Sequence, residues 1–154
     1  MAKKHWLMKS EPDVYSLDHL LKDKTTWWEG VRNYQARNFM MKEMSVGDEV
    51  LFYHSNAEPP GVAGLAQITR AAEPDALQFQ KSSEYFDPKA KKDQPVWYCV
   101  QVGGAKKFKN FISLEDLRRH KDLQDMLVLK RGQRLSIQPV TKKDFDLIKK
   151  LGGL

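Results

Sequence analysis

Short strand-like runs, each interrupted by proline, glycine or polar residues, constrain the fold of this sequence more than any other feature. Residues 96–102 (VWYCVQV) combine β-branched and aromatic residues and form the clearest predicted strand. Other predicted strands comprise residues 5–10, 49–55, 61–70 and 134–140. They do not alternate regularly with helices, as strands do in parallel α/β proteins. The pattern favours an α+β domain built on a small, curved, mixed β-barrel flanked by helices.

Polar side chains that cap helices mark where the predicted helices begin. Ser16 precedes residues 17–23, Asn33 precedes about 34–44, Ser113 precedes 114–120, and Thr141 precedes 142–151. Shorter helical pieces are predicted near 74–80 and 122–127. Gly61 and Gly64, inside a predicted strand, indicate bends or a close approach of two backbones.

The length and charge of the chain allow a nucleic-acid partner without identifying one. With 154 residues, no internal repeat and no linker, residues 1–154 are predicted to form a single domain. The net charge is +6, but residues 1–88 hold 10 Lys/Arg against 13 Asp/Glu, whereas residues 89–154 hold 16 against 7. An anionic partner would explain this asymmetry. Lysines that solvate helix faces are the simpler explanation.

No segment has the composition of a membrane span or of a signal peptide. A single cysteine, Cys99, excludes an internal disulfide and a thiolate cluster. We therefore predict a soluble protein without a membrane partner, cytoplasmic or, in a eukaryote, nuclear.

Familiar catalytic and metal-binding motifs are missing from the sequence. It contains no GxSxG, Walker, HExxH or CxxC pattern, and its four histidines are scattered. We therefore predict no metal, no cofactor and no enzymatic activity. Residues distant in sequence can still converge, and Glu11 or Glu29 beside a pocket would be a candidate base.

Aromatic residues with polar neighbours are the most informative feature for function. The aromatic candidates are Trp28, Tyr34, Tyr53, Tyr85 and Trp97, and the polar ones are Ser10, Asn33, His54, Ser55 and Gln138. A nucleobase needs both a flat surface to stack on and hydrogen bonds along its edge. Each residue also has a structural explanation: Trp97 as a core residue, Asn33 as a helix cap, His54 as a buried structural histidine.

Basic residues near the predicted strand 134–140 are candidates for phosphate contacts. Lys130, Arg131 and Arg134 cluster just before or at its start, and Lys106, Lys107 and Lys109 lie elsewhere in the positive half. Such contacts would make binding depend strongly on salt. Exposed lysines are also commonly solvated without any partner.

Several longer motifs resemble the EVE domain, a PUA-like family. They are KSEP (9–12), WEGVRNYQARNFM (28–40), GDEVLFYHS (47–55), SEYFDPKA (83–90) and RLSIQPV (134–140). They follow in order over nearly the whole chain, and Trp27 is an additional aromatic beside the family-type Trp28. The resemblance implies a PUA-like fold, kinship with YTH domains and recognition of modified nucleobases in DNA or RNA, with no established catalytic activity.

The same resemblance implies where the site residues would stand. Lys9 and Ser10 would form one pocket wall, Trp28, Val31, Asn33 and Tyr34 another, and Tyr53, His54 and Ser55 the facing strand. Arg32 or Arg37 would contact a phosphate or brace the loop internally. Arg131, Arg134 and Gln138 are placed by motif alone.

Three functions follow from these residues. The first is a non-catalytic reader of a modified base, such as methylated cytosine or adenine. The second is an enzyme that acts on nucleotides or modified nucleic acid through the same pocket. The third is an adaptor whose aromatic patch binds another protein.

Overall fold

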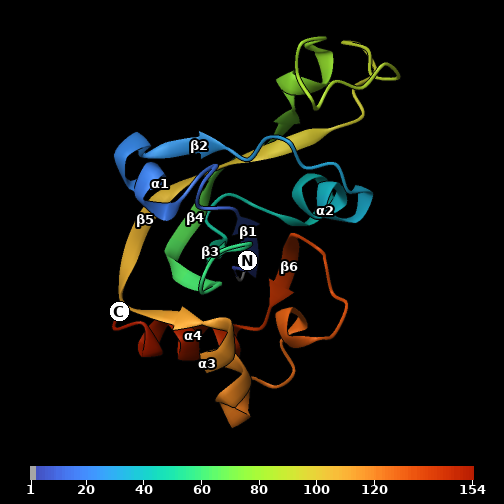
Figure 1. The fold of residues 1–154 in the computed structure, drawn as a ribbon. Helices are drawn as coiled ribbons and strands as arrows, with labels where there is room; N and C mark the ends of the chain where they lie inside the picture. The colour runs from blue at the N-terminus through green and yellow to red at the C-terminus, as the bar shows by residue number, and fades with distance from the viewer. Residues whose placement is uncertain (1–2) are drawn as a thin grey trace.

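A six-stranded mixed sheet forms the centre of the computed structural model, which describes residues 3–154 (Figure 1). In spatial order the strands are β2 (Thr25–Trp27), β5 (Tyr98–Ser113), β4 (Gly61–Pro74), β3 (Glu49–His54), β1 (His5–Ser10) and β6 (Ile137–Val140). Strands β1 and β3 are parallel, and all other neighbours are antiparallel. Strands β2 and β6 lie at the two edges, so the sheet is curved but not closed into the predicted barrel. The predicted α+β class is confirmed.

Helices flank the sheet and begin at the predicted caps. The α-helices are α1 (Leu17–Asp23), α2 (Tyr34–Asn38), α3 (Leu114–Arg119) and α4 (Lys142–Leu151). At each start the capping side chain accepts a backbone N–H bond, from His19 at Ser16, Ala36 at Asn33, Asp116 at Ser113 and Asp144 at Thr141. The predicted helix over 34–44 divides, because α2 continues as a π-helix, η1 (Phe39–Glu43). Three short 3₁₀ helices complete the set: η2 (Ala76–Phe79), η3 (Lys121–Leu123) and η4 (Leu127–Leu129).

Strand lengths are where the sequence prediction was wrong. Strand β4 runs four residues past the predicted end at Arg70, and β5 continues to Ser113 rather than residue 102. Repeated register shifts between β4 and β5 let these long strands bend, so their sequences lack a steady period of two. Strand β6 begins only at Ile137, and the three-residue β2 was not predicted.

The predicted close approach at the β4 glycines is confirmed. A side-chain carbon at Gly61 or Gly64 would overlap the backbone carbonyl oxygens of Ile112 or Lys106 on β5. Glycine at these positions therefore permits the tight bend of the β4–β5 pair.

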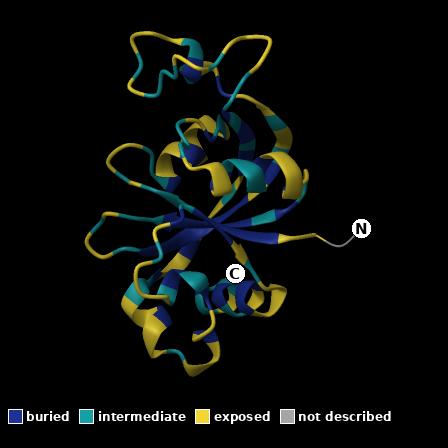
Figure 2. Ribbon diagram, turned by 90° about the vertical axis from the view of Figure 1, so that its right-hand side faces the viewer, coloured by how far each residue is buried: buried dark blue, intermediate teal, exposed yellow. Residues whose placement is uncertain are grey.

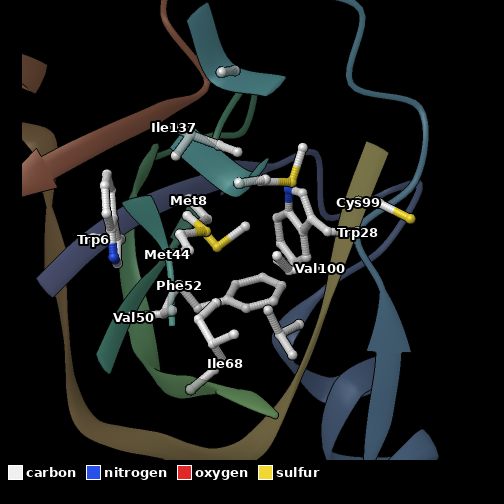
Figure 3. Close-up of a cluster of buried hydrophobic side chains, with 14 of the residues drawn as sticks. Trp6, Met8, Trp28, Met44, Val50, Phe52, Ile68, Cys99, Val100 and Ile137 are labelled. Atoms are coloured by element: carbon white, nitrogen blue, oxygen red, sulfur yellow. The ribbon is translucent and has the colours of Figure 1, made fainter. Parts of the chain in front are cut away.

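Two hydrophobic clusters cover the two faces of the sheet. Figure 2 shows the buried strands at the centre of the molecule. Along β1, Trp6 and Met8 belong to the first cluster and Leu7 to the second, as the alternation of a strand requires. Figure 3 shows part of the first cluster, where Met8 and Trp28 lie near Phe52. The second cluster packs beneath α3 and α4, where Phe145 and Ile148 are fully buried. Because both faces are covered, β1 reads as a continuous apolar run.

Between β4 and β5 the chain leaves the sheet over residues 75–97, drawn in light green to yellow at the top of Figure 1. The amide of Gln78 closes the base of this excursion. It donates to the carbonyls of Asp75 and Trp97 and accepts from the N–H groups of Val96 and Trp97, at 2.7–2.9 Å. The excursion therefore has a fixed attachment beside loop 28–32.

In the part of the chain described, residues 3–154, no helix is long and apolar enough to cross a membrane. The cytoplasmic or nuclear location stays a prediction.

Candidate functional site

A pocket of about 470 Å³ opens where β1 ends, beside β2 and the base of the 75–97 excursion. Its lining residues are Lys9, Ser10, Val14, Tyr15, Thr26, Trp27, Trp28, Glu29, Gly30, Val31, Arg32, Leu77, Tyr85 and Ser136. This volume lies in the range typical of small-molecule sites. The loop that prompted the sequence prediction thus borders a real concavity.

Residues at the end of β1 form the first wall. The N–H of Lys9 donates to the carbonyl of Ser136 at 2.8 Å, and the Ser10 hydroxyl donates to the carbonyl of Tyr15. The ammonium of Lys9 lies 5.9 Å from the ring centroid of Tyr53, and burial lowers the pKa of Lys9. Lys9 therefore lines the pocket, while its ammonium reaches the ring of Tyr53.

The loop after β2 forms the second wall, and Gly30 determines its shape. Gly30 adopts φ +84°, and a side-chain carbon there would lie 3.1 Å from the ring of Tyr85. Its N–H donates to the carboxylate of Asp75 at 2.8 Å. Glycine thus allows both the left-handed turn and the approach of the Tyr85 ring.

A buried ion pair fixes this loop against the excursion. Asp75 is fully buried, and its carboxylate accepts from Arg32 at 3.0 Å and from the N–H of Leu77 at 2.8 Å. Arg32 also donates to the carbonyl of Tyr85 through Nε and Nη2. The guanidinium carbon lies 5.3 Å and 5.2 Å from the rings of Tyr85 and Trp97. Arg32 therefore braces the pocket internally, one of the two roles left open by the sequence.

Arg37 is engaged in the same way, away from the pocket. It donates to the carbonyl of Val96 at 2.9 Å and to the side-chain oxygen of Asn38. Its guanidinium carbon lies 4.8 Å from the ring of Tyr34, which in turn stacks on Trp97 at 4.9 Å. These contacts tie α2 to the excursion.

Glu29 is the carboxylate within the pocket lining. Burial raises the pKa of Glu29, the nearby Asp75 carboxylate raises it further, and Arg32 opposes both. Burial likewise raises the pKa of the phenols of Tyr15 and Tyr85. The pocket environment therefore raises the pKa of all three acidic groups.

The structure brings together only part of the predicted site. Lys9, Ser10, Trp28, Val31, Arg32 and Tyr85 line the pocket. Trp28 gives it little surface, because it is 8% exposed and its ring packs edge-on against Phe52 at 5.5 Å (Figure 3).

Other predicted residues lie outside the pocket for identifiable reasons. Asn33 caps α2, and Tyr34 and Trp97 stack on one another. Tyr53 points into the second hydrophobic cluster. His54 accepts the N–H of Leu17 through Nε2 at 3.1 Å. The Ser55 N–H donates to the carbonyl of Ser10. Gln138 is buried beside α4.

Lys130, Arg131 and Arg134 are exposed on the segment that leads to Ser136. They are not part of the pocket lining, but the chain reaches the pocket two residues after Arg134. They remain candidates for contacts to phosphates outside the pocket.

Several lining residues were not predicted from the sequence, notably Trp27, Tyr15, Thr26 and Ser136. Trp27 belongs to β2, which pairs with β5, with Trp27 opposite Gln101. The available signal was the run Thr25–Trp28 itself, β-branched and aromatic but only four residues long.

The described residues hold no cluster of three or more His, Cys, Asp or Glu side chains that would bind a metal ion. The EVE domain family matches residues 4–151. The chain belongs to the EVE domain family.

Relatives of known structure share this fold. Human thymocyte nuclear protein 1 is 42% identical over 163 residues, covering 94% of this chain and 72% of the human protein. A crystal structure of the human THYN1 protein in complex with DNA containing 5-methylcytosine superposes with a TM-score of 0.90, at 42% identity and 99% coverage of both chains. A Pseudomonas putida protein gives a TM-score of 0.91 at 44% identity, covering 96% of this chain and 99% of its own. The fold is PUA-like.

Proposed function

We propose that this EVE domain is a non-catalytic module that binds nucleic acid and captures a modified nucleobase in the pocket beside residues 26–32. The observation that carries the proposal is the pocket itself, in a fold shared with a THYN1 protein bound to DNA containing 5-methylcytosine. By analogy, 5-methylcytosine in DNA is the first ligand to test.

The pocket offers the two kinds of surface that a base requires. Trp27 and Tyr85 are partly exposed aromatic residues in its lining, and Ser10 and Glu29 supply polar groups. A carboxylate accepts a hydrogen bond from the exocyclic amino group of cytosine, and an apolar surface accommodates its 5-methyl group. We assign stacking to Trp27 and Tyr85 rather than to the mostly buried Trp28.

Phosphate contacts must come from cations that are not already engaged. Arg32 and Arg37 use their donors within the protein, so we assign them to bracing. Lys130, Arg131 and Arg134 are exposed and remain the phosphate candidates. Stacking contributes about 1–3 kcal/mol per base, while extruding a base costs a few kcal/mol, so phosphate contacts are needed for useful affinity.

The test compares duplexes that differ only in 5-methylcytosine or cytosine, with binding followed by fluorescence anisotropy. We expect tighter binding to the methylated duplex. Trp27→Ala should weaken that binding by about 1–3 kcal/mol. Phe111→Ala is the matched control, since it removes an exposed aromatic residue of β5 that does not line the pocket. Equal affinity for the two duplexes, or equal loss in both variants, would contradict base capture.

The enzymatic alternative rests on Glu29, whose raised pKa suits a general acid or base. It predicts turnover of the modified oligonucleotide, abolished by Glu29→Gln. The reader proposal instead expects intact oligonucleotide after prolonged incubation and weaker binding by the same variant.

A further inference from the structure

A second pocket, of about 310 Å³, lies between β6, the start of α4 and the chain just before η4. Its walls include Asp125, Met126, Leu127, Gln138, Val140 and Asp144. Three of these side chains are aliphatic or a thioether, and the other three carry oxygen acceptors. This composition differs from the aromatic lining of the first pocket.

Gln138 faces this pocket from the sheet. Strand alternation places Gln138 and Val140 on the face opposite Ile137, toward the cluster beneath α4. Gln138 is 1% exposed, and its Nε2 donates to the carbonyl of Leu135 at 2.8 Å. Its Oε1 accepts no hydrogen bond from any of residues 3–154. An acceptor is thus left open at the wall of the cavity.

Asp144 faces the pocket from the helix. It is 8% exposed and lies one turn from Ile148 on the buried side of α4. Its N–H donates to the Thr141 hydroxyl, but its carboxylate accepts nothing from the described part of the chain. The first turn of a helix stabilises an ionised carboxylate. Asp144 therefore presents an unpaired negative charge.

Both acceptors are open to the pocket rather than sealed in the core. Throughout residues 3–154, no fully buried side-chain nitrogen or oxygen lacks a hydrogen-bond partner. The Asp144 carboxylate and the Gln138 oxygen have none, so they must remain accessible, and both residues line this cavity. Groups buried this far are stabilised by a donor, and a cation would satisfy both the charge and the hydrogen bonds.

We propose that this pocket binds an organic cation, an ammonium or guanidinium carried on an aliphatic stem. Ammonium and guanidinium groups are donors only, which matches acceptors from Gln138 and Asp144. Asp125, an exposed carboxylate of the lining, adds a second negative charge. Met126, Leu127 and Val140 provide apolar surface for the stem. The proposal does not depend on the function of the first pocket.

Such a cation is found in free aliphatic amines and in the lysine and arginine side chains of proteins. The probes are n-pentylamine for the first source and Nα-acetyl-lysine-N-methylamide for the second. Neutral 1-pentanol controls for the apolar stem alone. Binding is followed on the ¹⁵N-labelled full chain by amide chemical shifts.

We expect n-pentylamine to shift amides within 125–127 and 137–145, and 1-pentanol to shift them far less. Asp144→Asn should weaken amine binding by about tenfold or more, as expected for loss of a charge-assisted hydrogen bond. Asp146→Asn is the matched control, because Asp146 is on the same helix, pairs with Lys142 and does not line the pocket. If the lysine derivative binds as well as pentylamine, the occupant is a protein side chain; if only pentylamine binds, it is a free amine.

Two results would overturn the proposal. One is equal response to pentylamine and 1-pentanol in the unmodified protein, which requires no variant to fold. The other is unchanged amine affinity in a folded Asp144→Asn protein. Either result would mean that water satisfies these acceptors.

Discussion

The pocket beside residues 26–32 and the pocket beside the start of α4 lie against different hydrophobic clusters, and their polar groups are paired to opposite extents. In the first, Asp75 and Arg32 bond to each other and to nearby backbone groups. Aromatic rings face this cavity. In the second, the side-chain oxygens of Asp144 and Gln138 line a partly aliphatic cavity and accept no hydrogen bond from residues 3–154. The first is a rigid frame suited to select by shape and stacking. The second is suited to select by charge.

The same substitution in each pocket should give the largest contrast. Asp75→Asn weakens a buried ion pair and the acceptor of two backbone N–H groups, so we expect a loss of about 3 kcal/mol in the free energy of unfolding. Asp144→Asn removes a charge that accepts no hydrogen bond from residues 3–154, so stability should change by less than about 1 kcal/mol, the usual effect of a helix terminus. Urea denaturation measures both. Similar losses in the two variants would remove the distinction between the pockets.

Alanine at two glycines separates backbone strain from the shape of the first pocket. Gly30 and Gly47 both have positive φ, but only at Gly30 would a side-chain carbon meet a neighbour, the Tyr85 ring. We expect Gly47→Ala to cost about 1–2 kcal/mol from strain alone and Gly30→Ala to cost more. Gly30→Ala should also weaken binding to methylated DNA. If the two variants were equally stable and bound DNA equally, the close approach of the Tyr85 ring to Gly30 would not determine the position of Tyr85.

Removing the exposed ring of Tyr34 tests how far the rigid frame extends. Tyr34 is 59% exposed and stacks on Trp97, and the Arg37 guanidinium lies close to both rings. We expect Tyr34→Ala to lower the free energy of unfolding by about 0.5–1.5 kcal/mol, the usual value for an aromatic pair. Thermal unfolding monitored by circular dichroism would show it. If the stability of Tyr34→Ala is unchanged, the stack on Trp97 does not contribute to the rigid frame, which then depends on Asp75 and Arg32.

The smallest expected effect is a pH dependence from His54, which lies outside both pockets. Burial lowers the pKa of His54, whose neutral Nε2 accepts the N–H of Leu17. As pH falls below about 6.5, the unfolded chain takes up this proton more readily than the folded one, so stability is lost. The melting temperature should therefore drop from pH 8 to pH 5, and less so in His54→Gln. An identical pH profile in that variant would assign the effect to other groups.

Local chemistry made the helix starts predictable, whereas long-range pairing determined what the sequence missed. Ser16, Asn33 and Thr141 bond to backbone three residues away, so their role can be read from neighbours. Strand β2 depends on β5, more than 70 residues further on, and three residues carry too little pattern to reveal it.

The site followed the same rule. The motif around residues 28–32 lies at the first pocket, as predicted. Two neighbouring residues that were predicted to line it, Asn33 and Tyr34, do not. Helix α2 turns Asn33 and Tyr34 away from the cavity, and the acceptors that immobilise Arg32 come from Asp75 and Tyr85. Asp144 reads in sequence as an ordinary acidic residue in a first helical turn, and only its burial distinguishes it.

The hydrogen bonds of the Gln78 amide affect which changes in sequence length this domain can tolerate. All four hydrogen bonds of its amide are made at the base of the excursion, which fixes Asp75 and Trp97 whatever lies between them. The entropy lost in closing a loop grows only slowly with its length, by roughly 0.6 kcal/mol for each doubling. Insertions or deletions after Tyr85 are therefore expected to leave the first pocket intact, so this segment can change its outer surface while the frame of the pocket stays constant.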